Sequence, residues 1–198
     1  MTERLTKAEP GETHIPNSWS PVDRDTFLFT VKKGDNYSLW TYSRKLRKAT
    51  PFGGVVSSNS SDGNFSPDGR WVEYSTVRGG ARRIFLQPFP STGEPHEISP
   101  GSTAAWSADG KELFILNNPA AVIFNVVPIT TRPIVTIGNP VPLPRRALMG
   151  SPGVDTVRNW DISPQDNRLL GHINSEELPQ IRVVLNWFRE LQERVPVK

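Results

Sequence analysis

The chain contains no cysteine among its 198 residues. A disulfide framework, a thiolate zinc site and a cysteine nucleophile are therefore excluded. Long apolar runs are missing as well: the longest, residues 120–127, is interrupted by Asn125 and is too short to cross a bilayer. The initial stretch MTERLTKAEPGETH lacks the apolar core of a signal peptide. We therefore expect no membrane insertion, and the residues themselves leave the cellular compartment open.

A strong charge of one sign is also absent. The 23 basic and 20 acidic residues leave a net charge of only +3. The basic residues form short clusters, such as residues 44–48 and the pair Arg82 and Arg83, and no basic helix or aromatic RNA-binding motif accompanies them. We interpret these clusters as solvated loop charge, and nucleic acid is not an expected partner.

The residue combinations that catalysis and metal binding require are missing too. His14, His96 and His172 lie far apart and in no HExxH motif, and no closely spaced DxDxDG calcium loop occurs. No GxSxG motif marks a hydrolase nucleophile, and Ser57–Ser61 is interpreted as a flexible loop. The sequence therefore predicts a protein that is not an enzyme by itself, with no catalytic residue, no metal site and no cofactor.

What the sequence does contain is a repeat. Four segments are related: SWSPVDRDTFLFT, NFSPDGRWVEYS, AWSADGKELFIL and DISPQDNRLLGHI. They share a serine in the same place, namely Ser20, Ser66, Ser107 and Ser163. The intervals between these serines suit a unit of about 40–50 residues, which is the size of one four-stranded propeller blade.

The chemistry of the repeat predicts a tight turn between two strands. In SPDG the proline presets φ, the aspartate tolerates the third turn position, and Gly69 supplies a positive φ at the exit. Apolar residues alternate beyond the turn, which is the period of a strand. An apolar residue precedes the turn in every copy: Trp19, Phe65, Trp106 and Ile162. Asp68 and Gly69 are thus interpreted as turn residues without a catalytic role.

The repeat predicts an all-β fold: a β-propeller of about four blades, each a four-stranded antiparallel sheet. It would form a single domain over residues 1–198, with blades at 14–56, 57–100, 101–146 and 154–186. We expect residues 2–6 to add a strand beside residues 180–185 and close the propeller; an open, partial propeller would instead allow two copies to pair as a homodimer. A short C-terminal helix is expected over residues 186–195, clamped onto the last blade or docking a partner. An ordinary β-sandwich is the alternative fold.

The repeat resembles the WD40-like (PD40) propeller repeat of the TolB family. The segments SPDGRWVEYSTVRGGARRIFLQPFPSTGEPHEIS, WSADGKELFIL and IRVVLNWFRELQERV are more similar still to the C-terminal propeller region of bacterial membrane-bound serine/threonine protein kinases. No glycine-rich loop, HRD or DFG of a kinase lobe is present, and the first and fourth turns depart from the DG pattern. The resemblance implies the C-terminal part of a longer receptor-kinase-like protein and an extracytoplasmic or periplasmic location.

The resemblance also implies a non-catalytic recognition or sensor module. Its partner would be a protein or peptide, or else a small ligand, bound at one rim or in the central channel. Candidate surface residues are Trp40, Tyr42, Arg82, Arg83 and Trp160, although packing on alternate strand faces accounts for most of them equally well. The alternative is a gating propeller domain associated with a prolyl-oligopeptidase-like hydrolase. The flanking reading frame distinguishes the two functions.

Overall fold

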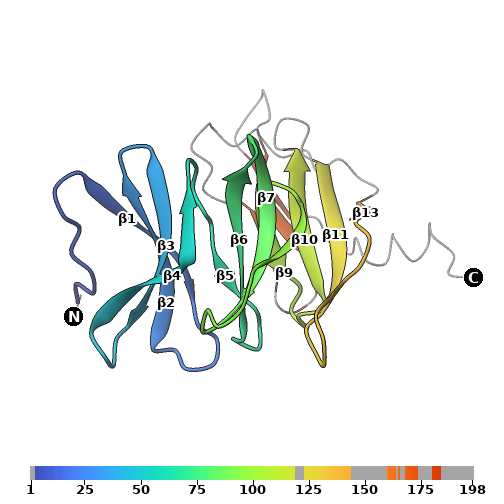
Figure 1. Cartoon of the computed structure of the whole chain (residues 1–198). Helices are drawn as coiled ribbons and strands as arrows, with labels where there is room; N and C mark the ends of the chain where they lie inside the picture. Colours follow the sequence, from blue (N-terminus) through green and yellow to red (C-terminus); the bar gives the residue numbers. More distant parts are fainter. Residues whose placement is uncertain are drawn as a thin grey trace, which may run out of the picture. The chain divides into compact units, whose positions relative to one another are not determined.

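The computed structural model of the chain describes residues 3–118, 123–143, 160–163, 165, 168–173 and 180–183. Every regular element within these residues is a β-strand, and antiparallel strand pairs build each of the sheets. The strands form four sheets, and each sheet takes its strands from one continuous stretch of chain (Figure 1). The prediction of an all-β protein with repeated antiparallel sheets is therefore confirmed.

The first two sheets are simple meanders of four strands in sequence order. The first sheet consists of β1 (Glu12–Trp19), β2 (Thr26–Lys33), β3 (Asn36–Ser43) and β4 (Lys48–Ser57). The second sheet consists of β5 (Asn64–Phe65), β6 (Trp71–Arg78), β7 (Ala81–Pro88) and β8 (His96–Pro100). Because each strand pairs with the next along the chain, short turns suffice to connect them.

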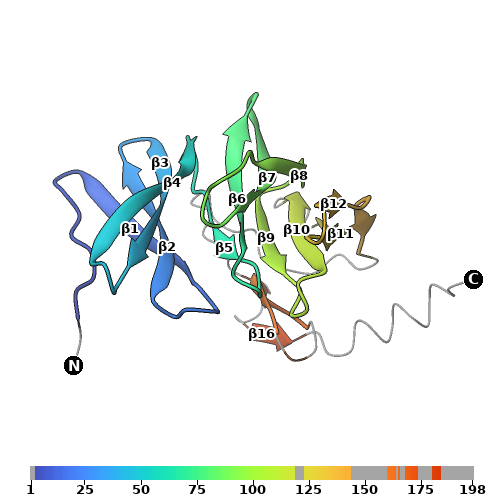
Figure 2. The same ribbon diagram turned by 60° about the horizontal axis from the view of Figure 1, so that its bottom comes forward.

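The third and fourth sheets vary this plan. The third sheet consists of β9 (Thr103–Trp106), β10 (Glu112–Asn118), β11 (Ile123–Thr130), β12 (Thr136–Ile137) and β13 (Val141–Pro142). Both β12 and β13 pair with β11, so this sheet has five strands instead of the predicted four. The described part of the fourth sheet consists of β14 (Trp160–Ile162), β15 (Leu169–Ile173) and β16 (Gln180–Val183), of which β16 is labelled in Figure 2.

The chain divides into two compact units, Met1–Ala104 and Ala105–Lys198. In the first unit, the first and second sheets share one hydrophobic core. In the second unit, the third and fourth sheets share another. The single domain over residues 1–198, its blade boundaries and its closure stay predictions.

The same backbone hydrogen bond recurs in all four sheets and allows their residues to be aligned. The amide of each repeat serine donates to a carbonyl at the start of the following strand, with N–O distances of 2.8, 2.8, 2.9 and 2.7 Å along the chain. The acceptor residues are Thr26, Trp71, Glu112 and Arg168. These four residues are therefore equivalent, and counting from them aligns the sheets residue by residue.

The two faces of each sheet can then be compared between repeats. One face of each sheet carries the residue before the turn serine and the first and third residues after the acceptor; we call it the leading face. The opposite face is called the trailing face. In the first unit, the leading face of the second sheet, with Phe65, Val72 and Tyr74, packs on the trailing face of the first sheet, with Leu28 and Leu39.

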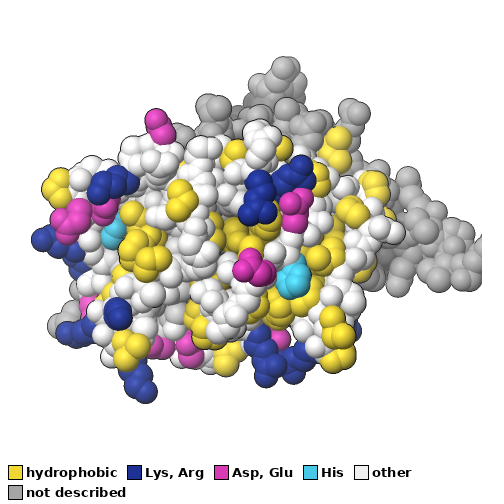
Figure 3. All heavy atoms as spheres, in the orientation of Figure 1, with side chains coloured by type: hydrophobic (Ala, Val, Ile, Leu, Met, Phe, Trp, Pro, Cys, Tyr) yellow, Lys and Arg dark blue, Asp and Glu magenta, His cyan; other side chains and the backbone are white. Residues whose placement is uncertain are grey.

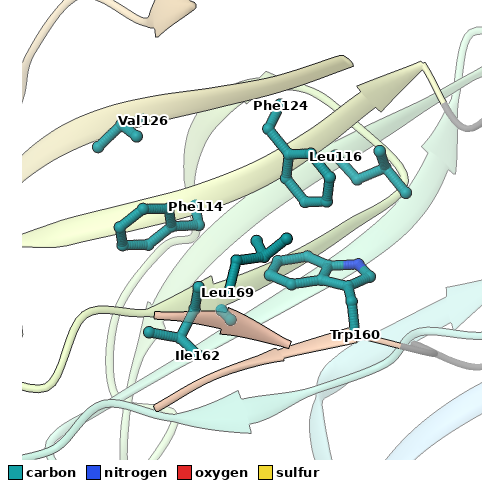
Figure 4. Close-up of a cluster of buried hydrophobic side chains, with 8 residues drawn as sticks. Phe114, Leu116, Phe124, Val126, Trp160, Ile162 and Leu169 are labelled. Carbon is teal, nitrogen blue, oxygen red and sulfur yellow. The ribbon is translucent and has the colours of Figure 1, made fainter. Parts of the chain in front are cut away.

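The second unit repeats this arrangement. Ile162 and Leu169 on the leading face of the fourth sheet pack on the trailing face of the third sheet, where Phe114 and Leu116 lie (Figure 4). Both units therefore obey one rule: the leading face of a sheet covers the trailing face of the sheet before it.

The N-terminal segment differs from its prediction. Residues 3–9 form no strand, and in Figures 1 and 2 they run along the outside of the first sheet. Side-chain contacts hold them there: Thr6 Oγ1 and His14 Nδ1 lie 3.0 Å apart, and Glu3 lies 3.9 Å from Arg44. The strand expected at residues 2–6 is thus wrong for residues 3–6. Residues 1–2, and the helix predicted over residues 186–195, lie outside the described residues.

Candidate functional site

The serine and aspartate of the second turn hydrogen-bond to the turn itself. Ser66 Oγ donates to Asp68 Oδ1 at 2.6 Å and accepts from the amide of Trp71 at 3.0 Å. The amide of Gly69 donates to the Ser66 carbonyl at 2.8 Å, and Gly69 has a φ of 68°. The third turn, around Ser107, makes the same bonds. The interpretation of Asp68 and Gly69 as turn residues is therefore confirmed.

The first turn reaches the same result with different residues. Asp23 accepts hydrogen bonds from the amides of Asp25 at 2.9 Å and Thr26 at 3.1 Å. Burial alone would raise the pKa of Asp23, but these bonds and that from the Thr26 hydroxyl outweigh it, so the pKa is lowered. Arg24 takes a positive φ of 51°, as Gly69 and Gly110 do in the second and third turns. The altered sequence therefore preserves the turn.

The serine-rich link Ser57–Ser61, interpreted from the sequence as a flexible loop, is instead mostly buried and hydrogen-bonded to the second sheet. Ser57, Ser60 and Ser61 are all buried. The Ser60 carbonyl accepts from Arg82 Nη2 at 2.7 Å, and the Ser61 carbonyl accepts from the Ser75 amide at 2.8 Å. Because β6 and β7 supply donors to its carbonyl groups, the link is held in place along the second sheet.

The two candidate arginines have different environments although they are adjacent. Arg82 Nη2 also donates to Ser75 Oγ at 2.9 Å, and burial lowers the pKa of Arg82 while the charge of Asp62 opposes that shift. Arg83 Nη1 lies 2.6 Å from Glu97 Oε1, and both side chains are partly exposed. Arg82 thus bonds to the link and to Ser75, whereas Arg83 pairs with Glu97, and both arginines are half-buried.

Trp160 is not a surface residue, which corrects its selection as a candidate. Its exposed fraction is 3%. Its ring meets the ring of Phe124 edge-on at a centroid distance of 4.8 Å, and Figure 4 shows it pointing from the fourth sheet toward Leu116 and Phe124. The reason is its position on the leading face of the fourth sheet, which packs on the third.

The structure brings Trp40 and Tyr42 together on the leading face of the first sheet. Strand pairing aligns Trp40 with Phe29, and Tyr42 with Phe27. Trp19 pairs with Phe27 from the other side. We call this set the aromatic face: Trp19, Phe27, Phe29, Trp40 and Tyr42.

The rings of the aromatic face contact one another across three neighbouring strands, β1, β2 and β3. Centroid distances are 5.0 Å for Trp19 and Phe27, 5.3 Å for Phe27 and Tyr42, and 6.4 Å for Phe29 and Trp40. Phe29 is buried, Phe27, Trp40 and Tyr42 are half-buried, and Trp19 is 50% exposed. Sequence reasoning selected Trp40 and Tyr42 but missed Trp19, Phe27 and Phe29. The signal that could have found them is the period of two along β2 combined with the position of the turn.

The described parts of the chain show no metal site, and one face of the molecule shows mixed charge. These residues contain no group of three or more His, Cys, Asp or Glu side chains arranged to hold a metal ion. On the face shown in Figure 3, basic and acidic side chains are interspersed. No helix in the described ranges has the length and apolarity to cross a membrane.

Comparison with known proteins gives likeness to solved structures only. No protein-family model and no curated protein matches the chain. TolB from Acinetobacter baumannii is 19% identical with a TM-score of 0.68, over 92% of this chain and 42% of that protein. A putative TolB from Agrobacterium tumefaciens is 21% identical with a TM-score of 0.58, over 87% and 58%. An oligogalacturonate lyase in complex with manganese is 15% identical with a TM-score of 0.58, over 89% and 50%.

These matches bear on the fold alone. The chain spans 42% and 58% of the two TolB structures, so it corresponds to only part of each. At such identities neither activity nor partner carries over. The repeated antiparallel sheets and their likeness to these structures show that the chain has a β-propeller fold, which is similar to the fold of the two TolB structures.

Proposed function

We propose that the chain is a non-catalytic recognition module that binds a protein partner through the aromatic face of its first sheet. The observation that carries this proposal is the exposure of Trp19, 50% of which faces solvent beside the half-buried Phe27 and Tyr42. A contiguous aromatic surface of this kind is typical of protein interaction sites. The partner is expected to cover these rings and exclude water from them.

The chemistry of the face favours a protein over a small polar ligand. Tryptophan and tyrosine bring a large contact area at a low cost in side-chain entropy. The indole Nε1 of Trp40 already donates to Ser38 Oγ at 2.9 Å, so Trp40 offers mainly its ring. Sites for small ligands usually bring a few polar groups together in a pocket, whereas the aromatic face offers mainly rings. A small ligand is therefore the weaker alternative.

The absence of catalysis is part of the proposal. In the described turns, the serine and aspartate side chains hydrogen-bond within the turn, as the Ser66–Asp68 and Ser107–Asp109 pairs do. The fold does not decide the matter, since one similar structure is a lyase. An assay of the purified chain on oligogalacturonate with and without manganese is expected to show no turnover, and measurable turnover would contradict the proposal.

We further propose that the module derives from a longer receptor-kinase-like protein and acts outside the cytoplasm. This is supported by the resemblance of residues 18–195 to kinase-associated propeller regions. The gating role beside a prolyl-oligopeptidase-like hydrolase is the alternative. An upstream kinase and membrane helix in the reading frame would support the first origin, and a downstream α/β-hydrolase with GxSxG would support the second.

Site-specific photo-crosslinking tests the binding surface. Benzoylphenylalanine replaces Tyr42 on the aromatic face and, in a matched control, Tyr37 on the opposite face of the same strand. Both tyrosines are half-buried, so access to the probe is comparable. Irradiation in the native host is expected to give a defined protein adduct at position 42 that is absent at position 37. Equal adducts at both positions, or none at position 42, would contradict the proposal.

A further inference from the structure

We infer that a second copy of this chain covers the aromatic face, using the trailing face of its own fourth sheet. The inference rests on the proposed function and names the partner of the same surface.

The aromatic face is an inter-sheet packing surface by its register. When the first and second sheets are aligned on the acceptors Thr26 and Trp71, each of the five residues of the aromatic face has an equivalent in the second sheet. These equivalents, in the order from Trp19 to Tyr42, are Phe65, Val72, Tyr74, Phe85 and Gln87. All five are buried in the first unit, and Phe65 is only 7% exposed where Trp19 is 50% exposed. The surface that the second sheet buries under its neighbour is thus open to solvent in the first sheet.

The occupant that fits such a surface is the trailing face of another sheet. Both units show this pairing: the leading face of the second sheet packs on Leu28, and that of the fourth packs on Phe114. Leu28 and Phe114 hold the same repeat position, two residues after the acceptor, and both have no exposed surface. In the fourth sheet Leu170 holds this position and is 45% exposed. The fourth sheet therefore presents an apolar side chain at its trailing position that is partly exposed.

One chain supplies both halves of the interaction. The open leading face lies on the first sheet, and the open trailing position, Leu170, lies on the fourth. Two copies related by a twofold axis would cover both at once, the aromatic face of each copy against Leu170 of the other. Such a pair is closed, because it leaves neither surface free to recruit a third copy. Burial of aromatic and aliphatic surface supplies the driving force.

Analytical ultracentrifugation of the full chain tests the inference with one substitution on each surface. Trp19→Glu and Leu170→Glu each place a charge on one half of the interface. The parent chain is expected to sediment as a concentration-dependent dimer, and each variant is expected to raise the dissociation constant at least about tenfold. Leu46→Glu and Ile134→Glu are matched controls, because both side chains are exposed apolar residues outside the two surfaces. The controls are expected to dimerise like the parent.

Mixing the two variants gives the decisive measurement. The intact aromatic face of the Leu170→Glu chain can still meet the intact Leu170 of the Trp19→Glu chain. An equimolar mixture is therefore expected to form a heterodimer that neither variant forms alone. Near-ultraviolet circular dichroism checks that each variant is folded, and Trp19→Ser replaces Trp19→Glu if the charged variant is not.

Several outcomes would overturn the inference. The parent chain could be monomeric at every concentration, as closure within one chain would require. The dimer could also persist in both variants, or the mixture of variants could fail to associate. The crosslink at position 42 separates this inference from the proposed function. An adduct with another protein would leave the function standing while overturning the second copy as its partner. An adduct with this chain itself supports both.

Discussion

The leading faces of the first and second sheets occupy the same positions of the repeat and have different surroundings. In the second sheet the face is closed over, and its polar atoms bond to each other: Tyr74 Oη donates to Gln87 Oε1 at 3.3 Å. Burial raises the pKa of Tyr74 to about 12. In the first sheet the equivalent residues are all aromatic, and all except Phe29 are partly exposed to solvent. The comparison teaches that a repeat position does not determine burial; the presence of a neighbouring sheet does.

The cover on the second sheet also shows in how closely the backbone of the first sheet approaches it. Gly53 of β4 faces Gln87 on the leading face of the second sheet so closely that a Cβ atom would overlap the glutamine side chain. The backbone of the first sheet thus fits against the face that it covers. Substitutions at matched positions of the two faces test how much this fit contributes to stability.

The largest expected effect comes from the pair Phe85→Ala and Trp40→Ala, which truncate equivalent positions. Phe85 is fully buried, so its truncation is expected to lower the free energy of unfolding by about 3–5 kcal/mol. Trp40 is half-buried, so its truncation is expected to cost only about 1–2 kcal/mol in dilute solution. Urea denaturation of both variants measures the difference. Equal losses would mean that the two faces are covered alike.

The next effect tests the close approach of the first sheet to the second. Gly53 and Gly54 both have a positive φ, 57° and 65°, so alanine at either position is expected to cost about 1 kcal/mol in backbone strain. Gly53→Ala must also displace Gln87, whereas a Cβ on Gly54 would meet nothing within 4 Å. We expect Gly53→Ala to lower the melting temperature further than Gly54→Ala. The reverse order would contradict the fit between the two sheets.

A smaller effect concerns the turn of the first sheet. The pKa of Asp23 is lowered in the folded state, so its charged form stabilises the fold at neutral pH, and this contribution is lost as the pH falls through the folded-state pKa. Asp23→Asn is expected to cost about 1 kcal/mol at neutral pH through weakened hydrogen bonds. The difference from the parent should shrink below about pH 4. Denaturation across this range measures it, with the exposed Asp35→Asn as control; a constant difference would argue against the charge.

The smallest effect on the free energy of unfolding is expected from the Arg83–Glu97 ion pair at the edge of the second sheet's leading face. Arg83 pairs with Glu97 at 2.6 Å, but both side chains are partly exposed. Arg83→Met is therefore expected to change the free energy of unfolding by less than about 1 kcal/mol. Salt should reduce the effect further, because it screens exposed charges. A larger loss that resists salt would show that the cover extends over Arg83.

The sequence predicted those parts of the fold that local chemistry determines. The Ser66–Gly69 turn contains its own hydrogen-bond donors, acceptors and positive φ, so its role could be derived without tertiary contacts. The class of fold and the repetition of sheets followed from four such turns. The number of strands in the third sheet did not, because both β12 and β13 pair with β11 over only two residues each.

The candidate site was only partly predictable, for a physical reason. Alternation along β3 places Trp40 and Tyr42 on one face, and this much follows from sequence. Whether a face is covered depends on the neighbouring sheet, so the sequence alone does not reveal that Trp160 is buried. The same holds for the link at Ser57–Ser61, since the donors that hold its carbonyl groups come from Ser75 and Arg82, distant in sequence.

The turn at Ser66 also bears on the order in which the protein folds. Its hydroxyl and the Trp71 amide that it accepts from are only five residues apart, so they can meet as soon as that stretch of chain is free. Hairpins close in about 1–10 μs, and local contacts speed folding. Each sheet can therefore start to form during synthesis, before the next has been made. The faces between sheets close afterwards, because they join residues such as Leu28 and Val72 that lie far apart in the sequence.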